Sequence, residues 1–156
     1  MKKVYLFFSA MLLVCAVQAQ IIHVPGDFST IQQGIIAASP GDTVLVDEGI
    51  YYEQISFLGK KPLMVASRLL MDGDTSHISN TIIDGSQITN SDTGSVVLFT
   101  SGEDTTSILY GFTVRNGTRG TKFEIPGYPD CRAGGGIYLA GSGWFLSGNT
   151  FLLGGF

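Results

Sequence analysis

The stretch FSTIQQGIIAASPGDTVLV, residues 28–46, combines the pattern of a short helix with that of a β-strand. Ser29 and Gln32 have the spacing of a capping box, and Pro40 with Gly41 ends the helix. Its apolar residues recur on one helical face, namely Ile31, Ile35 and Ala38. A helix of about ten residues is marginal on its own. We therefore expect it to form because this face covers other elements.

After this helix the chain has the pattern of short strands between Gly, Asp, Asn and Ser turns, and no second helix is predicted. The expected strands begin at Thr43, Pro62, Thr81, Ser95, Ser107, Gly135 and Asn149. The first three starts are 19 residues apart, which indicates a solenoid. Continuous apolar runs such as TVLV favour parallel strands over the alternating pattern of a β-sandwich.

In a solenoid of this kind the first coil has a bare end that must be covered, because open strand edges invite aggregation. The short helix at the start of residues 28–46 is expected to be that lid. The predicted coils start at Thr43, Pro62, Thr81, Ser107 and about Gly143.

The composition suits one folded β domain. The chain has 156 residues, of which 44% are hydrophobic and 14% charged, and it contains 21 glycines. This length is enough for one hydrophobic core. Low charge and plentiful aromatic residues argue against disorder, and abundant glycine indicates many turns.

The first residues, MKKVYLFFSAMLLVCAVQAQ, have the pattern of a bacterial secretory signal peptide. Lys2 and Lys3 precede an apolar run, and small residues lead to a cut after Ala19. The alternative, a membrane anchor, is disfavoured because the run is shorter than the ~20 residues of a span. We predict residues 1–19 as the signal peptide and residues 20–156 as a secreted or surface-exposed domain.

The charge of the predicted mature chain limits its partners. It carries seven basic and thirteen acidic side chains, a formal charge of −6. A duplex-binding protein needs the opposite sign, so no nucleic-acid partner is expected. Cys131 is the one cysteine left, so no intramolecular disulfide can form.

The opening VPGDFSTIQQGIIAASPGDTVLVDEGIYYEQISF resembles that of secreted proteins of the pectin lyase-like superfamily. The matching residues are Phe28, Thr30, Ile31, Gln32, Pro40, Gly41, Asp42, Val44, Gly49, Tyr51 and Glu53. The resemblance implies an all-β solenoid, a right-handed parallel β-helix of about five coils, with the short helix as its N-terminal cap. Pectin methylesterases share this opening, as do many secreted β-helix proteins that resemble the stretches TIIDG, LYGFTVRNG and GGGIY.

The resemblance does not extend to catalytic motifs. The pectin methylesterase motifs Gln-Asp-Thr-Leu, Asp-Phe-Ile-Phe-Gly and Gly-Arg-Pro-Trp do not occur, and no set matches the arginine and calcium-binding aspartates of pectate lyases. We therefore assign no catalytic, cofactor or metal residue and predict a non-catalytic module with a carbohydrate- or surface-binding face. The alternative is the N-terminal part of a polysaccharide-acting enzyme, a pectinesterase or lyase.

The ending FLLGGF, residues 151–156, is apolar and has no polar cap. Solenoids usually end in a polar cap. We expect further coils of a longer chain or end-to-end self-association.

Two groups of acidic residues have alternative interpretations. Asp72, Asp74, His77 and Asp84 lie in MDGDTSHISNTIIDG, where carboxylates could bind Ca²⁺, but turn chemistry is the favoured interpretation. Glu103 and Asp104 could be a pair of hydrolase carboxylates. Adjacent strand residues point to opposite faces, which favours a solvated turn. Neither His77 nor the other histidine, His23, has the spacing of a catalytic or metal site.

Three further features concern turns and binding. The long segment of residues 118–131 is predicted to be a loop, and its Tyr128 could stack on a sugar ring. Glycines 134–136 lack the lysine of a phosphate loop and are expected to permit close packing. Asn116 and Asn149 are expected to bond backbone groups of adjacent coils. The resemblance gives Glu53 a structural role.

Overall fold

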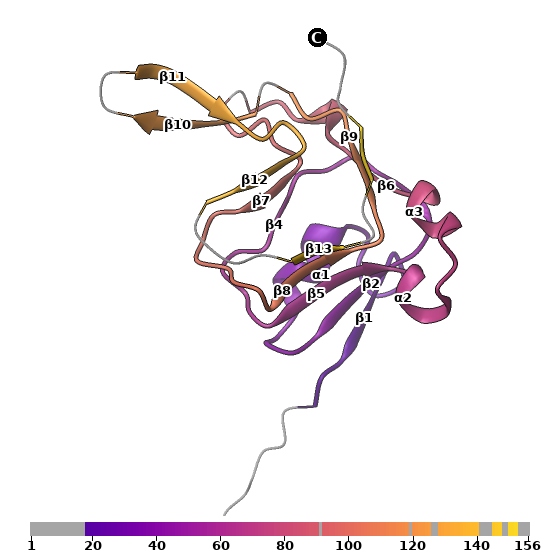
Figure 1. Ribbon diagram of the computed structural model, residues 1–156. Coiled ribbons are helices and arrows are strands. Elements are labelled where there is room, and N and C mark those ends of the chain that lie inside the picture. Colours follow the sequence, from indigo (N-terminus) through magenta and orange to yellow (C-terminus); the bar gives the residue numbers. More distant parts are fainter. Residues whose placement is uncertain are drawn as a thin grey trace, which may run out of the picture.

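The computed structural model describes residues 18–90, 92–118, 120–125, 128–140, 145–147 and 150–152, and it is mostly β-strands (Figure 1). The described helices are α1 (Ile31–Ala37), α2 (Leu69–Asp72) and α3 (Ser76–Asn80), with a 3-10 turn, η1, at Gly85–Gln87. Within these residues no helix combines the length and the apolar character that crossing a membrane requires.

In the described residues, the twelve strands outside one hairpin form three sheets, and every pairing within these sheets is parallel. The five-stranded sheet has the order β1 (Ile21–Val24), β2 (Thr43–Val46), β5 (Leu63–Ser67), β8 (Ser107–Tyr110) and β13 (Phe145–Ser147). The four-stranded sheet has the order β3 (Gly49–Tyr51), β6 (Thr81–Asp84), β9 (Thr113–Arg115) and β14 (Thr150–Leu152). The three-stranded sheet has the order β4 (Ile55–Ser56), β7 (Val97–Phe99) and β12 (Ile137–Leu139).

The chain visits these sheets in a fixed rotation. From β2 onward, successive strands lie in the five-stranded, the four-stranded and the three-stranded sheet, and the order then repeats. The antiparallel hairpin of β10 (Thr121–Ile125) and β11 (Tyr128–Ala133) is inserted between β9 and β12. Parallel pairing agrees with the predicted all-β class, since strands with continuous apolar runs are those buried in parallel sheets.

The hydrophobic core lies between the three sheets, which Figure 1 shows on three sides of it. Phe57, directly after β4, and Phe99 of the neighbouring β7 stack with ring centroids 4.2 Å apart. The other buried core residues come from all three sheets and α1, among them Val24, Ile31, Ile35, Val44, Val65, Ile83, Leu109 and Val114.

The predicted coil start at Thr81 is wrong. Thr81 pairs with Gly49 in the four-stranded sheet, so β6 continues the rotation that β5 began. In the five-stranded sheet, Leu63 pairs with Ser107, a separation of 44 residues, while Thr43 pairs with Met64 at 21. The equal spacing of 19 residues therefore does not mark successive coils, because its third strand, β6, lies in a different sheet from β2 and β5.

The irregular spacing has a physical cause. Residues 68–80 leave the sheets and form α2 and α3, two helices of four and five residues that the sequence analysis did not predict. Helices this short carry too few residues for a clear period of 3.6. The predicted start near Gly143 and the prediction for Asn149 fall outside the described residues.

Helix α1 packs its apolar face inward, as predicted. Ile31 and Ile35 are fully buried, whereas Ile36 is 58% exposed. The helix lies so close to β1 and β2 that a Cβ on Gly34 would be 2.9 Å from Cγ1 of Val44 and 3.2 Å from Cγ2 of Val24. Glycine at position 34 therefore permits the helix to lie against these strands.

The predicted capping box is wrong. The residue that caps α1 is Thr30, whose Oγ1 accepts a hydrogen bond from the N–H of Gln33 at 3.2 Å. Gln32 instead pairs with β4. The Ser56 N–H donates to Gln32 Oε1 at 2.7 Å, and Gln32 Nε2 donates to the Ser56 carbonyl at 3.2 Å. The side-chain amide thus occupies the free edge of the three-stranded sheet as a neighbouring strand would.

Both ends of α1 are held by charged side chains from the connections between the strands that follow it. The N–H groups of Ile31 and Gln32 each donate to the carboxylate of Glu53 at 2.9 Å. At the other end Lys60 Nζ donates to the carbonyls of Ile36 and Ala38. A carboxylate at the N-terminus and an ammonium at the C-terminus of a helix both complement its dipole. The structural role of Glu53 that the resemblance implied is confirmed.

Candidate functional site

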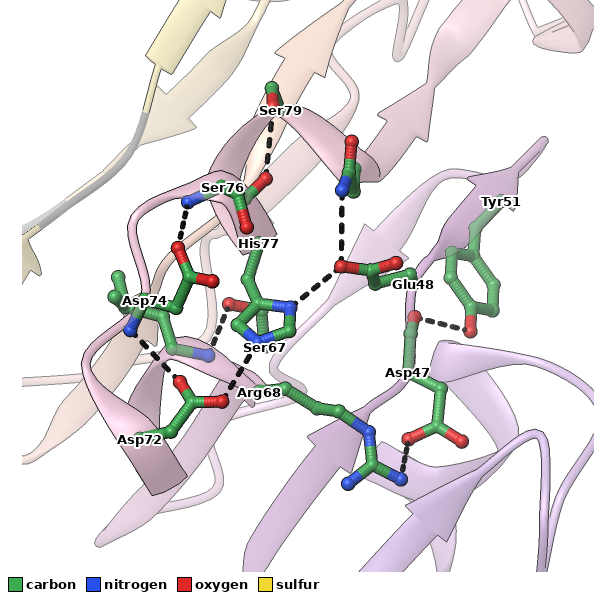
Figure 2. A network of polar contacts seen from close by, with 12 residues as sticks. Asp47, Glu48, Tyr51, Ser67, Arg68, Asp72, Asp74, Ser76, His77 and Ser79 are labelled. Carbon is green, nitrogen blue, oxygen red and sulfur yellow. Dashed lines mark hydrogen bonds and ion pairs between the residues drawn. The ribbon is translucent and has the colours of Figure 1, made fainter.

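His77 lies between two carboxylates in the segment that connects β5 to β6 (Figure 2). Its Nδ1 is 2.7 Å from Glu48 Oε1 and its Nε2 is 3.0 Å from Asp72 Oδ2, while its side chain is 13% exposed. The hydrogen bond to Asp72 raises the pKa of His77; partial burial opposes this, and Glu48 adds to it. Asn80 and His77 both lower the pKa of Glu48 by hydrogen bonding.

Because both ring nitrogens of His77 are engaged, this imidazole acts as a clasp in the described structure. It joins α2 and α3 to the connection between β2 and β3, where Glu48 lies. Asn80 Nδ2 adds a hydrogen bond to Glu48 at 3.1 Å. We define the His77 clasp as His77 with Glu48, Asp72 and Asn80.

The predicted turn chemistry of Asp72 and Asp74 is confirmed. Asp72 Oδ1 accepts from the N–H of Asp74, and Asp74 Oδ1 accepts from the N–H of Ser76, both at 2.9 Å. Gly73 adopts the left-handed conformation that ends α2, with φ 74°. The described residues contain no group of three His, Cys, Asp or Glu side chains that could hold a metal ion. Calcium binding, the alternative that the sequence analysis disfavours, is not tested by these contacts.

Arg68 and Tyr51 lie beside the His77 clasp and both contact Asp47 (Figure 2). An Arg68 guanidinium nitrogen is 2.7 Å from Asp47 Oδ1, and the Tyr51 hydroxyl donates to the Asp47 carbonyl at 2.9 Å. Burial, with the charges of Asp47 and Glu53, raises the pKa of Tyr51 to about 12. Tyr51 therefore stays a neutral hydrogen-bond donor at physiological pH.

Asp84 belongs to a separate, buried network. It is 2% exposed at the end of β6, and its carboxylate accepts from Arg115 Nε at 2.7 Å and from Asn116 Nδ2 at 3.1 Å. The Ser86 N–H donates to it at 2.9 Å. Burial favours the neutral acid, but the bonds from Ser86, Arg115 and Asn116 outweigh it and lower the pKa of Asp84 to about 2.

The Asp84 network corrects one expectation and explains one glycine. Asn116 was expected to bond a backbone group of an adjacent coil. Its side-chain amide instead donates to the carboxylate of Asp84 on the neighbouring strand. A Cβ at Gly85 would lie 2.6 Å from Val96 Cγ2 and 2.9 Å from the Asn116 carbonyl oxygen. The pair Asp84–Gly85 thus combines a carboxylate that binds the next strand with a glycine that lets it approach.

The interpretation of Glu103 as a solvated turn residue is wrong. Glu103 is 3% exposed, and its carboxylate accepts from the N–H of Gly59 at 2.9 Å and of Ser101 at 2.7 Å. Asp104, in contrast, accepts from the N–H of Thr106 at 2.9 Å and lies 3.4 Å from Lys61 Nζ on the surface. The two carboxylates therefore serve different turns.

The predicted long loop is partly a hairpin. In Figure 1, β10 and β11 project away from the three sheets. Lys122 pairs with Arg132 across the hairpin. The ring of Phe123 stacks on that of Tyr138 from β12, with centroids 6.4 Å apart and both side chains half-buried. The sugar-stacking prediction for Tyr128 concerns a side chain outside the described ones.

The base of the hairpin is bound to the segment that precedes β7 of the three-stranded sheet. Ser95 Oγ and Thr121 Oγ1 are 2.7 Å apart and buried. Gly134 has φ 63°, and a Cβ there would lie 2.0 Å from the Ile137 carbonyl oxygen. The expected close packing at glycines 134–136 is therefore seen at Gly134, whereas a Cβ at Gly136 would meet no atom within 4 Å. We define the hairpin face as the stacked side chains of Phe123 and Tyr138.

Several of these residues carry no signal in the sequence. Glu48 is 29 residues from His77, and Arg115 is 31 residues from Asp84. Such pairs become visible only when the register of parallel strands is known, because no local pattern joins them. His23, the other histidine, contributes its backbone N–H to Asp27 at 2.7 Å.

In comparisons with known proteins, no family model, no curated protein and no solved structure matched this chain. The interpretation of the site therefore rests on the contacts described above.

Proposed function

We propose that this chain forms an exported right-handed parallel β-helix with an N-terminal cap, and that it is a non-catalytic module that presents a carbohydrate-binding surface. The rotation of strands through three parallel sheets supports the architecture, since a chain coiled on itself produces this order. Helix α1, with Ile31 and Ile35 buried against the first strands, supports the role of a cap.

The observation that carries the function is the hairpin face. In repeat proteins insertions gather on one face, and that face is often the binding surface. Phe123 and Tyr138 form a rigid pair of rings that remains half-exposed. Aromatic rings offer a large apolar area with little rotamer entropy to lose, which suits the apolar faces of sugar rings. Lys122 and Arg132 pair across the hairpin and point to the face opposite that of Phe123, because adjacent strand residues alternate, so the stacked rings are the contact that supports binding.

Binding to immobilised polysaccharides tests this proposal. The purified chain is measured against polygalacturonate and neutral xylan in low and high salt, together with Phe123→Ala and Tyr138→Ala. Each variant should bind about tenfold more weakly, the loss expected for a central aromatic contact. Tyr52→Ala is the matched control, because Tyr52 is 50% exposed and lies just after β3.

The pattern across variants decides the outcome. Equal loss in the Tyr52 control, or full binding by both hairpin variants, would refute the hairpin face as the binding surface. Binding to polygalacturonate that disappears in high salt would assign the ligand to polyanions, since salt screens the attraction between opposite charges. Binding to xylan that salt leaves unchanged would assign it to neutral glycans.

A further inference from the structure

The backbone nitrogen of Gln20 is bound to a buried carboxylate. Its N–H donates to Asp42 Oδ1 at 2.8 Å, and the other oxygen, Oδ2, accepts from the N–H of Ser39 at 2.7 Å. Asp42 is only 5% exposed. The carbonyl of Gln20 is held as well, by the N–H of Thr43 at 2.9 Å. Gln20 is therefore fixed at both backbone groups just before β1.

Gln20 is also the first residue after the predicted signal-peptide cut. Gln18, Ala19 and Gln20 are exposed, so the bond between Ala19 and Gln20 is accessible in the folded domain. Cutting there converts the Gln20 N–H, a neutral donor in the uncut chain, into an α-ammonium group. A hydrogen bond between an ammonium group and a carboxylate is roughly twice as strong as one between neutral groups.

We propose that signal cleavage after Ala19 leaves the α-ammonium group of Gln20 paired with Asp42, and that this pairing prevents Gln20 from closing into a lactam. This proposal rests on the export proposed above in one respect, namely that the signal peptide is cut after Ala19. It adds a processing site to the N-terminal cap and gives Asp42 the role of protecting the new end.

The chemistry of an N-terminal glutamine explains the protection. In the unprotected case the neutral α-amine attacks Cδ of its own side-chain amide, a C–N bond forms in a five-membered ring, and the side-chain nitrogen leaves as ammonia with a proton from the amine. A protonated amine has no lone pair for this attack. Asp42 stabilises the protonated form and holds the nitrogen toward the turn of Ser39.

The test uses chains that begin at Gln20, released from a fusion by a protease that leaves no extra residue, so that export plays no part in the result. Lactam formation is followed by the loss of one ammonia in the mass spectrum at pH 7. The folded chain should react about tenfold more slowly than Asp42→Asn, because a rise of one unit in the α-amino pKa lowers the neutral amine about tenfold.

Two controls make the result specific. Asp27→Asn should react like the unchanged chain, because Asp27 accepts an N–H bond at the same end, from His23, and does not contact Gln20. The unchanged chain unfolded in urea should react as fast as Asp42→Asn, which keeps the test valid if that variant folds poorly. Titration of the α-amino group by NMR should give a pKa above the usual value of about 8 in the folded chain alone.

Equal reaction rates in the folded chain, the unfolded chain and Asp42→Asn would overturn the proposal. So would an exported protein whose first residue is not Gln20. An uncyclised Gln20 at the exported end, with a rapid reaction in Asp42→Asn, would establish it. Failure of glycan binding would leave this result unaffected, so the two proposals fail separately.

Discussion

Replacing Asp84 with asparagine should destabilise the domain through a charge that the fold depends on. The carboxylate is 2% exposed and receives bonds from Arg115, Asn116 and Ser86. Its pKa falls from 3.8 to about 2, which corresponds to roughly 2 kcal/mol of stability at neutral pH. Solvent around the partly exposed Arg115 screens the pair, so we expect a loss of about 1–2 kcal/mol.

The pH dependence distinguishes this charge effect from lost packing. A carboxyl group with a lowered pKa in the folded state stabilises the fold above its unfolded pKa of 3.8, and the stabilisation is lost as the pH falls toward 2. The difference between the unchanged chain and Asp84→Asn should therefore be full at pH 7 and should shrink below pH 4. Thermal unfolding should show a decrease in Tm of about 3–6 °C at pH 7.

Asp104→Asn is the matched control. Asp104 forms a surface ion pair with Lys61 at 3.4 Å, and exposed pairs contribute little, about 0–1 kcal/mol. Equal unfolding of Asp84→Asn and the unchanged chain at pH 7 would refute the assignment of the Asp84 network as a stabilising contact. A difference that stays constant from pH 7 to pH 3 would show that the loss arises from geometry and not from charge.

Four further changes test other parts of the structure. Ile35→Asp should cost about 3 kcal/mol or more and cause aggregation, whereas Ile36→Asp on the exposed side of α1 should leave urea unfolding nearly unchanged. Thr81→Val should raise stability by about 1 kcal/mol in the same assay, because the buried Thr81 hydroxyl has no hydrogen-bond partner among the described residues; a lower stability would contradict this. The raised pKa of His77 means that its clasp is complete below pH 6.5 and weakens as the pH rises through the raised value, so the amide protection factors of residues 68–80, which correct for the intrinsic pH dependence of exchange, should be lower at pH 8 than at pH 6, and His77→Gln should abolish that difference. The purified chain should release neither methanol from pectin nor unsaturated products from polygalacturonate, with or without Ca²⁺, and release of either would favour the enzyme alternative.

The local parts of this fold could be predicted from the sequence, and the long-range parts could not. Helix α1 and strand β2 have clear periodicity, and the structure contains both. The predicted coil start at Thr81 is wrong because residues 68–80 leave the sheets. The two short helices in this segment have no sequence period from which its length could be predicted. Glu103 looked like a surface residue because one of its donors, Gly59, is 44 residues away. In a rotation of parallel strands, burial depends on register, and register is a long-range property.

The role of Gln32 also depends on a long-range contact that the local sequence does not predict. From its spacing it looked like part of a cap for its own helix, yet its amide completes the hydrogen bonds of Ser56 at the free edge of β4. At the free edge of β1, the N–H of His23 donates to Asp27 Oδ2, and the carbonyl of His23 accepts from the N–H of Asp27, each at 2.7 Å.

The backbone groups of Ser56 in β4 and of His23 in β1 are thus occupied by a side chain and a turn from the first part of the chain. A strand from a second molecule could add at Ser56 or His23 only by displacing contacts that already exist. Unpaired edges are where β-proteins aggregate, so these contacts make the edges at Ser56 and His23 poor sites for strand addition. Gln32→Ala should open the edge at Ser56 while leaving the buried face of α1 intact, because Ile31 and Ile35, and not Gln32, fill the core.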